Sequence, residues 1–268
     1  MSTTDPFGAF KAIQRQGWAH FTPLEAITTG PAGKLVKFAG IRSGQNVLDV
    51  ACGTGVASVT AARRGATVTA LDLTPELLVR ARENAAIAGV NIAWHEGDAE
   101  QLPFPDASFD VVVSQFGHMF APQPAVVIGE MLRVLKVGGT IAFSTWPPEL
   151  LVGKMFALVG RYMPPPPPGV APPPQWGDVS VVRERLGTAA RDLTFDRGTM
   201  QVFALSPQHS RLLSEKTAGP VVKLVEMLST SDPSRLETFR QEYEALIAPY
   251  FEDNVIRQDF LMTRGVKV

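Results

Sequence analysis

The sequence predicts an α/β fold in which a doubly wound parallel sheet carries helices on both faces. Two observations predict it. Short apolar runs alternate with segments of helical pattern between residues 47 and 145, and the first run leads directly into a turn that contains two glycines. The chain has 268 residues, 45% of them hydrophobic, which is enough to bury a sizeable core in one large or two small domains.

The first strand and its turn carry the strongest signal. Residues 47–50 read Val-Leu-Asp-Val, which suits a parallel strand that is covered on both faces. Gly53 and Gly55 permit positive φ and leave no Cβ, so a ligand can lie almost against the backbone. A helical pattern over 56–64 follows, and its first free N–H groups point into the same crevice. We therefore expect a nucleotide-like ligand at this turn.

The next elements continue the alternation. We expect strands over 66–73, 91–95, 109–114 and 140–145, and helices over 75–88 and 124–136. The first of these helices begins with a threonine cap, Thr74, and a proline at its first position, and Gly89 can close it in the left-handed conformation. The second helix is expected to stop before Gly138.

Both ends of the chain differ from this pattern. Residues 1–42 form a mostly helical lead-in that could act as a lid, and residues 43–146 form the ligand-binding core. Residues 147–254 hold an extended proline-rich connection, a helix that Asp178 caps, a sixth strand over 193–205, and a helical cap over 206–254. Residues 255–268 are expected to return to the core as a closing strand.

Acidic residues follow successive strands. Asp49 lies before the turn, and Asp72 ends the second strand 19 residues after Gly53, a spacing at which an acid can bind both ribose hydroxyls of an adenosine ligand. Asp98 ends the third strand, where an acid can accept a hydrogen bond from the exocyclic amine of adenine. All three open onto one crevice, so an adenosine ligand is the expected occupant.

The turn also distinguishes between adenosine cofactors. A dinucleotide-binding turn has a third glycine where this chain has Ser58, and no Gly-Lys-Ser/Thr phosphate loop follows. The turn contains no lysine or arginine for a pyrophosphate, whereas Asp49 suits a cationic ligand. S-adenosylmethionine, which carries an ammonium and a sulfonium, is favoured over NAD. An NAD-dependent oxidoreductase, and a protein that binds S-adenosylmethionine without methyl transfer, such as a cyclase, stay as alternatives.

Four segments resemble motifs of a known enzyme family. Residues 49–55, Asp-Val-Ala-Cys-Gly-Thr-Gly, resemble the first motif of the class I S-adenosylmethionine-dependent methyltransferases, with alanine where many members have their first glycine. Residues 97–104 and 109–113, and the segment 130–139, resemble the branch that includes ubiquinone and menaquinone methyltransferases. The resemblance covers about residues 35–146. The tail resembles a group of bacterial methyltransferases whose substrates are mostly unassigned.

The resemblance implies a fold and a set of cofactor contacts. The fold would be Rossmann-like, with seven strands of which the last is antiparallel. The contacts would come from nine positions: Asp49 and the backbone of Ala51, Gly53 and Gly55 at the methionine end, Asp72 at the ribose, Leu73 against the adenine, Asp98 and the backbone of Ala99 at the adenine edge, and Gln115 at the methionyl amine. The product would be S-adenosylhomocysteine.

Methyl transfer to oxygen or carbon can require a general base near the transferred methyl. His118, just after the fourth strand, is the catalytic candidate, and His20 and His95 are weaker ones. Cys52, the only cysteine, is expected to be a small turn residue, and no metal site is expected.

The tail is expected to form the acceptor site. It is rich in large apolar groups, which favours a small, largely apolar or aromatic acceptor and O- or C-methylation. No Asn/Asp-Pro-Pro-Tyr/Phe motif follows the fourth strand, which by resemblance argues against nucleic-acid bases as acceptors.

Charge and hydropathy limit the partners. The 25 basic and 26 acidic residues give a net charge of −1, which does not suit a broad nucleic-acid surface. The sequence shows no leader pattern and no apolar run approaching about 18 residues, so we expect a cytoplasmic protein without stable membrane insertion. The oligomeric state and the identity of the acceptor are left open.

Overall fold

A single mixed sheet forms the centre of the molecule. The computed structural model describes residues 5–268, and in that part of the chain eight strands follow the order β3-β2-β1-β4-β5-β8-β6, with β7 paired to β8. The strands are β1 (Asn46–Val50), β2 (Thr67–Asp72), β3 (Ile92–Glu96), β4 (Phe109–Gln115), β5 (Leu135–Thr145), β6 (Ala190–Phe203), β7 (Phe251–Glu252) and β8 (Val255–Lys267). β1 to β5 are parallel, and β8 runs antiparallel to both β5 and β6.

This topology confirms the predicted doubly wound, Rossmann-like sheet with an antiparallel last strand. The prediction missed β7, because residues 251–252 were assigned to a helical segment. They form instead a short hairpin with the start of β8, in which Phe251 faces Ile256.

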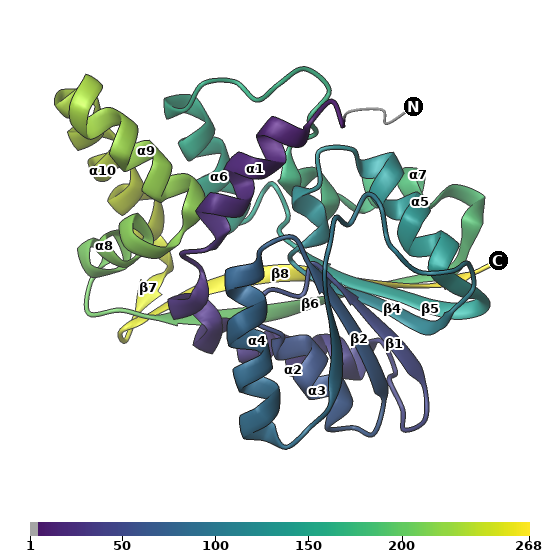
Figure 1. Cartoon of the computed structure of the whole chain (residues 1–268). Helices are drawn as coiled ribbons and strands as arrows, with labels where there is room; N and C mark the ends of the chain where they lie inside the picture. The colour runs from purple at the N-terminus through teal and green to yellow at the C-terminus, as the bar shows by residue number, and fades with distance from the viewer. Residues whose placement is uncertain (1–4) are drawn as a thin grey trace.

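Helices cover both faces of the sheet (Figure 1). One face carries α2 (Glu25–Phe38), α3 (Val56–Ala62) and α4 (Pro75–Ala88). The other carries α5 (Pro124–Val134) and α7 (Val179–Leu186), together with a cap of α6 (Leu151–Tyr162), α8 (Pro207–Thr217), α9 (Gly219–Ser231) and α10 (Pro233–Ile247). α1 (Gly8–Trp18) lies beside this cap and packs on α9, where Gly17 and Gly219 meet backbone to backbone.

The two-sided burial follows from the apolar strand sequences. On β4, Val111 and Val113 pack with Leu35 of α2 in one hydrophobic cluster. Val112, between them, packs in the cluster on the opposite face. Because alternate side chains of a strand point to opposite faces, a continuous valine run gives both helical layers a surface to pack on.

Several element boundaries differ from the predicted ones. Gly89 closes α4 in the left-handed conformation at φ 66°, as expected. The hydroxyl of Thr74 makes no capping hydrogen bond; the amide of Thr74 donates instead to Asp72 Oδ1 at 2.8 Å. α5 ends at Val134 rather than Lys136, because Leu135 already pairs with β4.

The proline-rich connection has two parts. Residues 164–168 are irregular, as expected of a proline run, whereas Pro173–Gly177 form a 3-10 helix. Asp178 caps α7 by accepting a hydrogen bond from the amide of Ser180 at 2.8 Å, as predicted.

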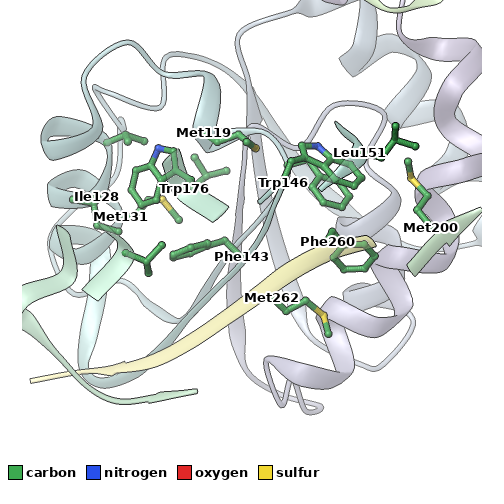
Figure 2. Close-up of a cluster of buried hydrophobic side chains, with 14 of the residues drawn as sticks. Met119, Ile128, Met131, Phe143, Trp146, Leu151, Trp176, Met200, Phe260 and Met262 are labelled. Carbon is green, nitrogen blue, oxygen red and sulfur yellow. The ribbon is translucent and has the colours of Figure 1, made fainter. Parts of the chain in front are cut away.

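One hydrophobic cluster joins the sheet to the tail. Figure 2 shows Trp176 of the proline-rich segment beside Phe143 of β5, and Trp146 beside Phe260 of β8. The ring centroids are 5.7 Å and 6.1 Å apart, respectively. The tail is therefore packed as part of the core. Among residues 5–268, no helix is long and apolar enough to cross a membrane.

Candidate functional site

Three residues of the glycine turn after β1 have a positive φ. Ala51 adopts φ 54°, Gly53 φ 56° and Gly55 φ 75°, so the backbone repeatedly enters the left-handed region. A Cβ on Gly55 would lie 2.6 Å from the Trp94 ring, whereas a Cβ on Gly53 would enter open space. Gly55 is thus required by packing, while Gly53 leaves room beside the cavity that it lines.

Asp49 lies beneath the turn rather than in the cavity. Its side chain is fully buried, and Oδ2 accepts a hydrogen bond from Ser58 Oγ at 2.5 Å. Oδ1 has no partner among the described residues. Burial raises the pKa of Asp49 to about 7. The serine that replaces the third glycine of a dinucleotide-binding turn therefore anchors this carboxyl group.

Asp72 joins the turn to the end of β2. Oδ2 accepts the Gly53 amide at 2.7 Å, and the side chain lines the cavity next to Leu73. Burial raises the pKa of Asp72, although two backbone amides donate to its carboxylate. A ribose hydroxyl could reach the same carboxylate from the cavity side.

Asp98 lies in an ion-pair cluster that the sequence did not predict. Lys11 Nζ of α1 is 2.6 Å from Asp98 Oδ2, 2.6 Å from Glu100 Oε2 and 2.8 Å from Asp5 Oδ2. Burial alone would lower the pKa of Lys11. The three carboxylates together have the larger effect and raise the pKa well above its usual value. Lys11, Asp98 and Ala99 all line the cavity.

Gln115 presents a free acceptor at the end of β4. Its Nε2 donates to the carbonyl of Thr28 in α2 at 2.7 Å, which fixes the amide plane. Its Oε1 is buried and has no partner in the described part of the chain, although the residue lines the cavity. An ammonium group would satisfy this oxygen.

The next residue places an aromatic wall beside the turn. Phe116 adopts φ 59°, which is rare for a bulky residue and marks a constrained position. Its ring stacks on Trp146, with centroids 4.2 Å apart and an interplanar angle of 9°. Gly117 follows without a side chain because a Cβ there would collide with Ala51. Nothing in the local sequence marks this pair of aromatic residues as part of the site.

These residues surround one cavity of about 300 Å³. Its first part lies between the glycine turn, Asp72, Asp98 and Gln115, beneath α1. Its second part extends into the tail. The apolar residues of the tail that line it are Val152, Met155, Phe156, Val159, Met200, Val202, Leu213, Ala218, Pro220 and Val221.

The position of His118 does not fit the predicted catalytic role. The ring is fully buried between Phe143 and Trp176, with centroids 4.6 Å and 4.7 Å away, and it does not line the cavity. Neither ring nitrogen has a partner among the described residues. Burial, and the charge of nearby Arg185, lower the pKa of His118 to about 3.

The other histidines also lie away from the cavity. His20 and His95 are exposed, and His95 packs its ring edge-to-face against Phe104 at 5.1 Å. His209 uses Nδ1 to accept the amide of Leu205. In residues 5–268 no histidine lines the cavity, so an imidazole base is not available there.

The residues present fit S-adenosylmethionine. The charged lining residues in the described chain are Lys11, Asp72 and Asp98, and the lysine is already paired with carboxylates. Gln115 offers an unpaired acceptor, and Gly53 leaves open space at the turn. A cationic adenosine ligand matches this arrangement, whereas a pyrophosphate would find no free cation at the turn.

Comparisons with known proteins agree with this geometry. A family model described as a methyltransferase domain matches residues 47–139. The uncharacterized protein Rv1403c of Mycobacterium tuberculosis is 36% identical over 252 residues, which cover 92% of both chains. The demethylmenaquinone methyltransferase of Deinococcus radiodurans is 33% identical over 154 residues, which cover 56% of this chain and 58% of that protein.

Solved structures show the same fold. The YcgJ protein of Bacillus subtilis superposes with a TM-score of 0.59 at 19% identity, covering 88% of this chain and 97% of its own. A Bacillus halodurans protein superposes with a TM-score of 0.60 at 23% identity, covering 88% and 98%. The family match and the relatives, together with the turn and the cavity, show that the chain belongs to the class I S-adenosylmethionine-dependent methyltransferases.

Proposed function

We propose that the enzyme transfers a methyl group to the oxygen or carbon of a small, largely apolar or aromatic acceptor. One observation carries the proposal: the cavity that begins at the glycine turn continues into a chamber walled by apolar residues of the tail. The stacked rings of Phe116 and Trp146 also line this cavity, and an aromatic wall suits a ring-shaped acceptor. The partner is thus a small molecule.

The cofactor contacts that we propose follow the lining of the first part of the cavity. Asp72 binds the ribose, Leu73 packs on the adenine, and Asp98 with the backbone of Ala99 reads its edge. Gln115 Oε1 accepts the methionyl ammonium.

The turn holds the methionine end. The backbone of Ala51 and Gly53 contacts it, while Gly55 and Asp49 support the turn from behind. When bound, S-adenosylmethionine supplies an electrophilic methyl group on its sulfonium. The chain's residues then act chiefly by aligning the acceptor with that methyl, which can supply roughly 7–11 kcal/mol in favourable cases.

The chamber restricts the acceptor further. Among the described lining residues of the tail we find no histidine, carboxylate or lysine that could take a proton. Tyr243, the one titratable group there, has its pKa raised to about 12 by burial. We therefore expect an acceptor held in this chamber to lose its proton to water, as phenols and enols do more readily than alcohols.

Incubation with methyl-labelled S-adenosylmethionine and a panel of phenols, enols, carboxylic acids and amines tests the proposal. We expect label in phenols or enols, at a rate that rises with pH up to the pKa of each acceptor. Label only in amines or acids would contradict the proposed acceptor class. Cofactor binding without transfer to any acceptor would favour the alternative of a binding protein or cyclase.

Some sequence-based expectations stay predictions. They are the cytoplasmic location, the absence of nucleic-acid acceptors, and the assignment of residues 147–254 as a substrate cap.

A further inference from the structure

The charges of the cavity are all at its cofactor end. Within the described chain, Lys11, Asp72 and Asp98 are the charged lining residues, and none of them comes from the tail. The tail nevertheless contributes four polar residues to the lining, and all four are neutral: Ser210, Ser214, Tyr243 and Gln258.

Two of these residues lie one turn apart on α8. Tyr243 Oη of α10 donates a hydrogen bond to Ser214 Oγ at 2.9 Å, which leaves the Ser214 hydroxyl hydrogen free to donate elsewhere. Ser210 is 6% exposed, and its hydroxyl makes no side-chain hydrogen bond that the structure of residues 5–268 shows. This face of α8 therefore presents two unused hydroxyl donors to the cavity.

A third neutral group comes from the sheet. Gln258 of β8 is 9% exposed and faces Met200 of β6 in the strand pairing; both line the cavity. Among the described residues, the side-chain amide of Gln258 has no hydrogen-bond partner. Because this amide lines the cavity, a ligand that displaces water from it must replace the hydrogen bonds of that water, or the amide is left unpaired at a cost in free energy.

We propose that these residues bind a neutral oxygen group of the acceptor, a ketone, ester or hydroxyl, at the end of the acceptor that points away from the cofactor. This proposal rests on the proposed function. A carboxylate or phosphate there would lose its hydration without meeting a cation, and a hydrocarbon end would leave Gln258 and Ser210 unpaired. A neutral oxygen avoids both costs, since the hydroxyls and the amide N–H can donate to it.

Three phenols that differ only in the substituent opposite the hydroxyl group test this recognition. 4′-Hydroxyacetophenone carries a neutral carbonyl, 4-hydroxybenzoate a carboxylate, and 4-ethylphenol an apolar group. Calorimetric titration into protein saturated with S-adenosylhomocysteine is expected to show the ketone binding at least about tenfold more tightly than the other two. Equal or tighter binding of the carboxylate or ethyl compound, or no binding of the ketone, would overturn the proposal.

Single substitutions test which residues cause the preference for the ketone. Gln258→Leu and Ser210→Ala are each expected to lower the affinity for the ketone toward that for 4-ethylphenol while leaving the affinity for S-adenosylhomocysteine unchanged. Gln201→Leu is the matched control, because Gln201 lies on the exposed side of the same strand pair. A preference for the ketone that survives both variants would also overturn the proposal.

The binding test is independent of turnover. If the ketone binds as expected but no labelled methyl reaches any acceptor, the proposed function fails and the recognition site stands. If methyl transfer occurs without preference for the neutral oxygen, the recognition site fails and the proposed function stands.

Discussion

Lys11 Nζ and Asp98 Oδ2 lie 2.6 Å apart, although 87 residues separate them in the sequence. The contact ties α1 to the loop after β3, at the place where the adenine is proposed to bind. The other Asp98 oxygen accepts the amide of Glu100 at 2.9 Å, so the carboxylate is held from two sides. α1 is thereby fastened over the cofactor part of the cavity.

Replacing Lys11 by methionine is expected to weaken S-adenosylhomocysteine binding roughly 5- to 20-fold, because Asp98 and Glu100 would lose their shared cation. Faster dissociation should account for most of the change, since α1 would no longer be held at that edge. Stopped-flow measurement of S-adenosylhomocysteine release checks both points. Lys34→Met is the control, because Lys34 is exposed and bonds only a backbone carbonyl of β6. Identical release rates in the two variants would rule out this role for Lys11.

Asp72→Ala is expected to weaken cofactor binding by about 1–3 kcal/mol, since both the ribose hydroxyls and the Gly53 amide lose a charge-assisted partner. Isothermal titration with S-adenosylmethionine measures the loss. Glu149→Ala, which removes an exposed carboxylate paired with Arg197, should leave the affinity unchanged. An Asp72→Ala protein of wild-type affinity would mean that the ribose lies elsewhere.

His118 provides a pH test of its buried position. Its pKa is about 3 in the fold and near 6.5 in an unfolded chain, so the unfolded state binds more protons between these values. The stability that the neutral ring contributes is complete above pH 6.5 and is lost as the pH falls toward 3.

His118→Leu should therefore flatten the fall in stability on the acid side, by up to about 3 kcal/mol at pH 4 relative to the wild type. Urea unfolding at a series of pH values measures the difference. Methyl transfer at neutral pH should stay within about twofold of the wild type, because the ring does not line the cavity. A drop in turnover of a hundredfold, with stability intact, would restore His118 as a catalytic candidate.

The sequence predicts those parts of the fold and of the site that depend on residues close together in the chain. The run from Val47 to Gly55 specifies a buried strand and a tight turn within nine residues, and Asp72 and Asp98 follow because parallel strands end at one edge. The pairing of Lys11 with Asp98 could not be read this way, since α1 has no pattern that fixes where its lysine lies.

The predicted catalytic role of His118 does not fit the structure for a similar reason. Its position after β4 indicated the site, but the ring is buried in the core against Trp176 of the tail and does not line the cavity. The same limit applies to α5, whose helical pattern continues past Val134 while pairing with β4 converts Leu135 to strand.

Substitutions of the two glycines in the turn are expected to separate an effect on cofactor affinity from an effect on stability. Gly53→Ala adds a methyl group at φ 56° in open space, so it should cost only about 1 kcal/mol of stability from backbone strain. Because that space belongs to the cofactor cavity, S-adenosylmethionine affinity should fall at least about tenfold.

Gly55→Ala should behave in the opposite way. Its Cβ would lie 2.6 Å from the Trp94 ring at φ 75°, so the free energy of unfolding should fall by about 2–4 kcal/mol. Gly33→Ala, in the exposed middle of α2 with no neighbour within 4 Å of the new methyl group, should instead stabilise the protein by about 0.5–1 kcal/mol. Thermal unfolding and cofactor titration of the three variants measure both quantities. If Gly53→Ala lost as much stability as Gly55→Ala while keeping its affinity, the turn would serve the fold and the cofactor would bind elsewhere.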